Sequence, residues 1–272
     1  MTNSDLLRSI SGDIRLHTEE DFEGMRKAGR LVGQCLDMLV GEVKPGVTTA
    51  YLDKLVETFV ADHGALSATI NYRGYRHASC ISINHVICHG IPAERPLREG
   101  DIANIDVTLI LDGWHGDHSR MYVAGKPKRK AERLMDVTYE ALMAGIAAVK
   151  PGAHFGDIGG AISAIARKHR YAVVDEFCGH GLGRLFHDNP NVIHSAAAGT
   201  GPVMEKGMFF TIEPMLNIGR ASHSLLADGW TAVTKDRELS AQFEHSVGVT
   251  DTGAEIFTKS PAGYDVPYRV ET

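Results

Sequence analysis

Two aspartates, Asp106 and Asp117, stand in a segment that otherwise has the features of a β-hairpin. The segment reads NIDVTLILDGWHGDHSR (residues 104–120), a β-branched run, a tight turn at Asp112-Gly113 and a second run. With this two-residue turn, Thr108 lies opposite Asp117 and Asp106 lies diagonally beside it, so both carboxylates lie within about 8 Å on one face. Such close acids repel each other, and their apolar surroundings make desolvation costly. The pattern therefore predicts a positive group between them.

Two further acids occupy strand positions later in the chain. Glu213 ends the short run FFTIE in front of Pro214, which places it at the tip of a strand. Glu244 shares one face of a second strand with Gln242 and Ser246, because side chains alternate along a strand. One face of the predicted sheet packs under helices, and the other carries the acids.

An internal repeat relates the segments that carry these acids. The tripeptide KPG occurs at residues 44–46 and again at 150–152, each time between two helical patterns. Three further features recur in the same order, which chance does not explain: CHG (88–90) and CGHG (178–181), a glycine six residues before Asp106 and before Glu213, and DGW (112–114 and 228–230). We therefore expect one catalytic domain, residues 18–272, built of two halves at about 18–125 and 126–257, after a short extension at 1–17.

Equivalent halves would bring Asp106 opposite Glu213 and Asp117 opposite Glu244. Four carboxylates carry a charge of −4, which two divalent cations neutralise, and an added imidazole gives the mixed oxygen and nitrogen shell that suits first-row metals. In two-metal hydrolases such ions lie about 3.5–4 Å apart. The competing interpretation is that each acid is simply exposed or salt-bridged. It fits any one of them, but not four at repeat-matched positions.

Bulk properties are those of a soluble globular protein: 272 residues, 43% hydrophobic, 23% charged and a net charge of −6. The charge argues against a nucleic-acid binder, and the basic KPKRK (126–130) is explained as a solvated loop. Four cysteines without metal-site spacing suit a reducing compartment, and no leader or membrane-spanning run is evident, so we expect a cytoplasmic protein. Seven of the 14 histidines are interpreted as surface or loop residues: His17, His63, His77, His154, His169, His194 and His223.

Five ordered motifs resemble the type I methionine aminopeptidases, over about residues 18–257. They are CISINHVICHGIP (80–92), NIDV with GDHSRMY (104–107, 116–122), GHGLGRLFHDNP (179–190), FTIEPM (210–215) and QFEHSV (242–247). The resemblance implies an α/β (α+β) pita-bread fold, in which a pseudo-twofold, curved and largely antiparallel sheet has helices packed on its outer face. It also implies hydrolysis that removes the N-terminal methionine from nascent proteins and peptides, with a preference for a small second residue.

The resemblance implies five metal ligands, which are Asp106, Asp117, His180, Glu213 and Glu244. Asp117 and Glu244 would bridge two divalent ions. Asp106 would hold one ion, while His180 and Glu213 would hold the other. Water on such ions ionises near neutral pH and provides hydroxide to attack the first peptide bond. The ligand types do not choose among Co, Mn, Fe, Zn and Ni.

Three residues are expected to act on the substrate. Glu213 would serve as general base and proton shuttle, and His187 would donate a hydrogen bond to the developing oxyanion. His89 would contact the scissile amide, although a structural histidine explains it equally well without the resemblance. By resemblance the pocket for the methionine side chain is lined by Tyr72, Tyr75, Cys80, Phe186 and Trp230, beside His89 and His187. Aromatic edges suit the methionine sulfur.

Four positions depart from the family's usual residues. They are Thr69 in the pocket, His85, His118 directly after Asp117, and Asp188 directly after His187. No departure removes a ligand, but they leave fine substrate preference open, and His118 could perturb metal binding.

Two other functions compete with this one. An Xaa-Pro peptidase of the same fold usually has an additional N-terminal domain and a further histidine after the HGxG element, where this chain has Arg184, Leu185 and Phe186. A non-catalytic pita-bread module that binds proteins or nucleic acid would lose metal ligands, and here all five are present. The expected partners are therefore peptides and nascent chains with N-terminal methionine, with transient ribosome contact, no membrane, no specific nucleic acid and a monomeric state.

Overall fold

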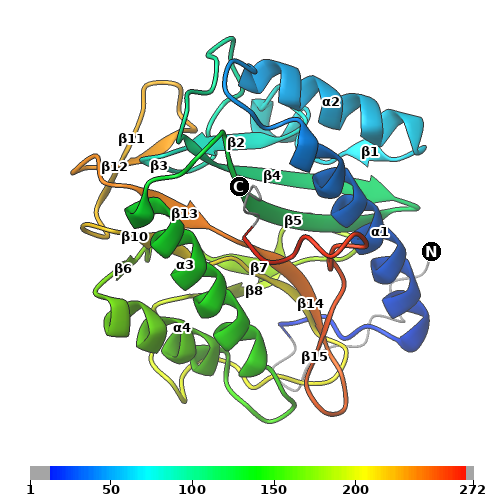
Figure 1. Ribbon diagram of the computed structural model, residues 1–272. Helices are drawn as coiled ribbons and strands as arrows, with labels where there is room; N and C mark the ends of the chain where they lie inside the picture. The colour runs from blue at the N-terminus through cyan, green and yellow to red at the C-terminus, as the bar shows by residue number, and fades with distance from the viewer. Residues whose placement is uncertain (1–12, 268–272) are drawn as a thin grey trace.

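The structure is a computed structural model that describes residues 13–267, so residues 1–12 of the predicted extension lie outside the described residues. Within this part of the chain, the α-helices cover one side of the strands (Figure 1). Their bounds are α1 Glu19–Met38, α2 Thr49–Asp62, α3 Arg129–Ala147 and α4 Phe155–His169, with 3-10 turns η1 Leu39–Gly41 and η2 Tyr72–Gly74. Thr18 caps helix α1: its hydroxyl accepts from the backbone N–H of Asp21, and its own backbone N–H donates to the Asp21 carboxylate.

The described strands form four antiparallel sheets, two larger and two small. The first larger sheet contains β1 Leu66–Ser67, β2 Cys80–Ile83, β4 Ile102–Leu111 and β5 Trp114–Val123. The second contains β7 Gly179–Gly181, β8 Asp188–Val192, β9 Phe209–Ile212, β14 His245–Val249 and β15 Ala254–Ile256. The small sheets contain β3 Val86–Cys88, β11 His223–Leu225 and β12 Ala232–Thr234, and β6 Ala172–Val173, β10 Met215–Asn217 and β13 Ser240–Gln242.

The predicted hairpin of Asp106 and Asp117 is the β4–β5 pair. Thr108 lies opposite Asp117, as the two-residue turn requires. The ladder runs without interruption from the pair Ile102–Val123 to the pair Leu111–Trp114. Asp112 and Gly113 both have positive φ, 51° and 79°, which is the backbone geometry of a type I′ turn. The two acids therefore lie on one face of this pair.

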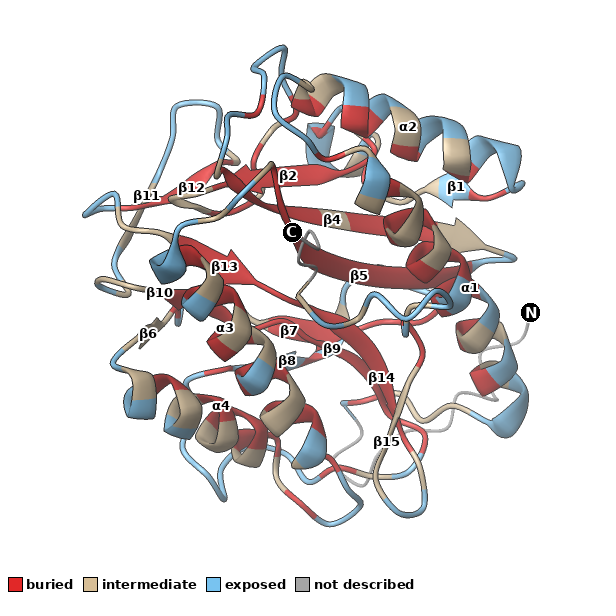
Figure 2. Cartoon of the chain, in the orientation of Figure 1, coloured by how far each residue is buried: buried red, intermediate tan, exposed pale blue. Residues whose placement is uncertain are grey.

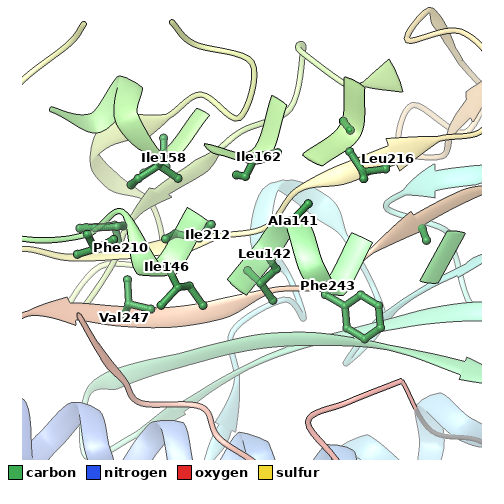
Figure 3. Packing of buried hydrophobic residues seen from close by; sticks show 14 of the residues in the cluster. Ala141, Leu142, Ile146, Ile158, Ile162, Phe210, Ile212, Leu216, Phe243 and Val247 are labelled. Atoms are coloured by element: carbon green, nitrogen blue, oxygen red, sulfur yellow. The ribbon is translucent and has the colours of Figure 1, made fainter. Parts of the chain in front are cut away.

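Apolar side chains fill the space between the helices and the strands, so that β2, β5, β9, β13 and β14 are buried throughout (Figure 2). One cluster joins α3 and α4 to β9 and β14, with Leu142, Ile158 and Phe210 among its members; Figure 3 shows their contacts. A second cluster joins α1 and α2 to β2 and β4. Each fully buried large side chain contributes about 1.5–3 kcal/mol, so the two clusters fix the strands that carry the acids.

Gly116 lets α1 pack directly on β5. A Cβ atom at Gly116 would lie 2.4 Å from the carbonyl oxygen of Ala28 in α1. Gly116→Ala is therefore expected to lower the free energy of unfolding by about 2–3 kcal/mol, through overpacking at this contact. Urea denaturation measures this, with Gly41→Ala as the control, because nothing lies within 4 Å of a Cβ at Gly41. Equal midpoints for the two variants would contradict the packing argument.

His17 lies in the loop before α1, as expected, but it is not a surface residue. Its side chain is 5% exposed, and its ring stacks on Phe209 with centroids 4.1 Å apart. Burial lowers the pKa of His17 to about 4, although Asp21 opposes that shift. The unfolded chain therefore takes up a proton below pH 6.5 that the folded chain refuses until about pH 4, and stability falls in this window.

Replacing His17 removes this acid sensitivity. Between pH 7 and pH 5 we expect the unfolding free energy of His17→Phe to fall by about 2 kcal/mol less than that of the wild type. Phenylalanine keeps an aromatic ring to stack on Phe209 but cannot be protonated. Urea unfolding at both pH values measures the difference, and parallel losses in the two proteins would show that His17 does not carry it.

Candidate metal centre and substrate pocket

The five residues predicted as metal ligands come from the two larger sheets. Asp106 and Asp117 lie on β4 and β5, His180 lies on β7, Glu213 follows β9, and Glu244 precedes β14. A β-bridge between Ser119 and Glu244 joins the sheets at this point. Asp117, His180, Glu213 and Glu244 are at most 9% exposed, and Asp106 is partly exposed.

Short distances connect four of these side chains. Three ligand atoms, one from each of Asp117, His180 and Glu244, lie within 4.8 Å of one another. The Nε2 atom of His180 is 3.5 Å from Asp117 Oδ2 and 3.7 Å from Glu213 Oε1. Asp106 lines the same cavity. The structure therefore brings the predicted set together.

The electrostatics of the cluster favour the binding of a cation. Burial, reinforced by the neighbouring carboxylates, raises the pKa of Asp106 and of Glu244 well above the usual range. Burial also raises the pKa of Glu213, to about 7. For His180, burial opposes ionisation, but Asp117 and Glu213 outweigh it and raise the pKa to about 9. Burying these acids together therefore costs free energy through desolvation and mutual repulsion, and a bound cation would offset that cost.

The donor set fits a divalent metal. The Nδ1 atom of His180 lies 3.1 Å from the Gly181 carbonyl oxygen and donates to it, which leaves Nε2, the nitrogen that faces the acids, to bind a metal when the ring is neutral. Carboxylate oxygens and one imidazole nitrogen are ligands that first-row divalent metals prefer.

All seven residues predicted for the substrate pocket line one cavity of about 610 Å³, together with the five predicted ligands. Aromatic rings form much of its wall: Tyr72 lies 4.9 Å from Phe186, and Tyr75 lies 5.0 Å from Trp230, between ring centroids. The Tyr75 hydroxyl donates to the Ser79 carbonyl, 2.9 Å away, so the ring presents an apolar surface. The wall suits an unbranched apolar side chain.

His187 and His89 reach the same cavity. The His187 ring lies 4.1 Å from that of His180 and 5.2 Å from that of Tyr72, between centroids. His89 has a φ of 56°, an uncommon conformation for a non-glycine residue, and its ring packs edge-on to Phe177. Strain of this kind is often found at functional sites.

Three polar side chains that we did not predict hold the acids in place. Thr108 Oγ1 donates to Asp117 Oδ1 at 2.7 Å, Thr211 Oγ1 donates to Glu213 Oε1 at 2.7 Å, and Gln242 Nε2 donates to Glu213 Oε2 at 3.3 Å. The sequence positions of Thr211 and Thr108 could have indicated these contacts, because Thr211 precedes Glu213 by two residues on one strand and Thr108 lies opposite Asp117.

His194 lies in a loop, as predicted, but it is not a surface residue. The residue is 1% exposed, and its Nε2 atom accepts a hydrogen bond from the backbone N–H of Glu213 at 3.1 Å. It therefore supports the main chain that carries Glu213. Sequence spacing contained no signal for this contact, because His194 lies in a loop 19 residues before Glu213.

The four departures fall in different environments. Thr69 is in the cavity wall, where its hydroxyl donates to the His77 carbonyl at 2.7 Å, and Asp188 is in the wall too. His85 lies 3.1 Å from an Arg237 nitrogen and does not line the cavity. His118 is buried behind the acids.

The fold and this site define a metallopeptidase: the model of metallopeptidase family M24 matches residues 23–251, and the chain belongs to this family. Within the family its place is among the methionine aminopeptidases. The methionine aminopeptidase of Rickettsia prowazekii is 53% identical over 93% of this chain and 98% of its own length. The predicted resemblance is thereby confirmed.

Solved structures agree with this assignment. A crystal structure of the Rickettsia prowazekii methionine aminopeptidase has a TM-score of 0.89 and covers 90% of this chain and 99% of its own. That of Thermotoga maritima has a TM-score of 0.88 at 36% identity, with 90% and 99% covered. The predicted fold class is confirmed. Prolidase from Pyrococcus furiosus shares the fold alone, at 21% identity and TM-score 0.73, with 90% of this chain and 65% of that chain covered.

Membership in a metallopeptidase family implies divalent metal, and the cluster of Asp117, His180 and Glu244 is a possible site for it. No helix within residues 13–267 is long and apolar enough to cross a membrane.

Proposed function

We propose that this chain is a metal-dependent aminopeptidase that removes the N-terminal methionine from peptides and nascent proteins, with a preference for a small second residue. The observation that carries the proposal is the placement of a buried Asp–His–Glu cluster in the wall of an aromatic-lined cavity. The names of its relatives point to the same activity.

We propose that five residues hold two divalent cations. Asp117 and Glu244 would be shared between the ions, Asp106 would hold one, and His180 and Glu213 would hold the other. When bound, such ions polarise a peptide carbonyl and lower the pKa of water. The donor set suits Co, Mn, Fe, Zn and Ni alike.

Glu213 has the environment of a proton shuttle. A carboxylate in this position can accept a proton from water and release it again. Hydrogen bonds from Thr211 and Gln242 fix its two oxygens. Glu213 would take the proton of the attacking water and return it to the leaving amine.

The cavity walls would bind the substrate. Tyr75, Trp230 and Phe186 would enclose the methionine side chain, and Cys80 would lie beside it. His187 would donate to the oxyanion that develops at the scissile carbonyl, and His89 would contact the scissile amide. The free α-amine would lie by the acidic cluster, which limits cleavage to the first residue.

The activity would fit a cytoplasmic monomer that acts on nascent chains, with transient contact to the ribosome. These settings are part of the proposal and rest on the substrate class. The division of the chain into two repeat-related halves, with residues 1–17 as an extension, is likewise proposed from the sequence repeat.

Peptide cleavage tests the proposed function. Protein supplied with a divalent metal should release free methionine from Met-Ala-Ser and little from Met-Lys-Ser, and should leave internal bonds intact. An enzyme that instead turns over Xaa-Pro peptides and releases no methionine would be an Xaa-Pro peptidase of the same fold. Binding of peptides without any cleavage would point to the non-catalytic module.

A further inference from the structure

His118 connects the acidic cluster to the outer layer of the protein. It follows Asp117 on β5, is 2% exposed, and does not line the cavity. Its Nδ1 atom lies within hydrogen-bond distance of the carbonyl oxygen of Glu244. The backbone N–H of Glu244 meanwhile donates to the Ser119 carbonyl at 3.1 Å. The peptide groups on both sides of the Glu244 Cα are therefore hydrogen-bonded to two consecutive residues of β5, His118 and Ser119.

The hydrogen bonds of His118 fix its tautomer. Arg120 Nε can only donate, and it lies 2.9 Å from His118 Nε2, so Nε2 is the acceptor. The ring proton is therefore on Nδ1, which donates to the Glu244 carbonyl. A neutral imidazole in this orientation satisfies both neighbours at once.

Arg120 extends the connection to α1 and the C-terminal segment. Its side chain is 3% exposed and forms an ion pair with Asp37 of α1. Asp37 also accepts from Ser260 Oγ at 2.6 Å and from the Ala262 N–H at 3.1 Å. A continuous chain of polar contacts, buried at Arg120 and His118, thus leads from the outer layer to the main chain of Glu244.

We infer that His118 is a positioning residue that fixes the Glu244 backbone relative to Asp117, and so sets the spacing of two carboxylates that face the metals. The inference rests on the proposed function, because it assigns both acids to the metals. β5 and β14 belong to different sheets, so the spacing depends on contacts that cross between them. Groups that orient ligands from behind commonly change metal affinity about 10–100-fold when removed.

A stacked neighbour offers a matched comparison. The His245 ring lies 4.6 Å from that of His118 and is equally buried, at 2% exposed, but its Nδ1 atom pairs with Thr258. Changes at His245 therefore disturb the same packing without removing the contact to the Glu244 carbonyl. A general packing role would affect both positions alike.

Substitution by asparagine or by glutamine tests the hydrogen bond of each His118 ring nitrogen separately. The amide of asparagine can occupy the place of Nδ1, whereas that of glutamine occupies the place of Nε2. Metal-free His118→Asn and His118→Gln would be titrated with Mn²⁺ by calorimetry, beside the wild type, His245→Asn and His245→Gln, and each unfolding midpoint would be recorded. We expect His118→Asn to bind within about threefold of the wild type and His118→Gln about tenfold or more weakly. Both His245 variants should bind as the wild type does, whatever their midpoints.

Different results separate the inference from the proposed function. Equal Mn²⁺ affinity of His118→Gln and the wild type overturns the inference, and so does equal weakening at His245. A wild type that takes up no Mn²⁺ overturns the proposed function instead. If His118→Gln does not fold, Arg120→Lys serves in its place, because lysine has a methylene where arginine has the Nε that donates to His118 Nε2. About threefold weaker binding supports the inference, and unchanged binding opposes it.

Discussion

Glu213→Gln is expected to lower kcat for methionine release from Met-Ala-Ser by about 10³-fold, the range that general acid–base catalysis contributes. Glutamine preserves the shape of the side chain, and its single amide oxygen can still accept the hydrogen bond from either Thr211 or Gln242. It cannot take up a proton at neutral pH, so it cannot transfer one from water to the leaving amine. Initial rates with saturating metal measure the loss.

Glu238→Gln is the control for Glu213→Gln. The Glu238 side chain is 44% exposed and pairs with Lys130 at the surface, where such pairs contribute little. The kcat of Glu238→Gln should match that of the wild type. Turnover of Glu213→Gln within a few-fold of the wild type would exclude Glu213 as the proton shuttle.

Glu244→Gln should change stability and activity in opposite directions. Glu244 is 2% exposed, and burial together with Asp117 raises its pKa well above the usual range. The neutral amide removes this like-charge repulsion, so the metal-free variant should melt about 3–6 °C above the metal-free wild type. Turnover should fall about 10³-fold, because metal-based charge stabilisation provides several kcal/mol.

The combination of the two results matters for Glu244. A residue that serves only the fold would lose stability on substitution and keep its turnover. Calorimetric melting after chelation, together with initial rates after metal is restored, measures both quantities on one preparation. A variant that melts lower and turns over normally would remove Glu244 from the metal site.

The hairpin and the gathering of the acids could be predicted because both follow from local rules. The two-residue turn at Asp112-Gly113 fixes the register, and the register places Asp106 and Asp117 on one face. The remaining predicted metal ligands were identified by family resemblance, from the motifs around His180, Glu213 and Glu244. The two-half division stays a prediction.

The network behind the acids could not be predicted, because its members are distant in the sequence. Strand alternation directs His118 away from Asp117, but nothing local indicates that Arg120 meets Asp37, 83 residues earlier. The contact between His194 and Glu213 depends in the same way on a loop path that no periodicity encodes. Both arise from tertiary packing, which places side chains together irrespective of pattern.

The central claim is that the converging carboxylates hold divalent metal that the reaction requires. Elemental analysis combined with a methionine-release assay on the same chelated and reconstituted sample tests it most directly. We predict that release from Met-Ala-Ser stops when metal falls below detection and returns when a single divalent metal is added back. Full activity in a sample without detectable metal would contradict the claim.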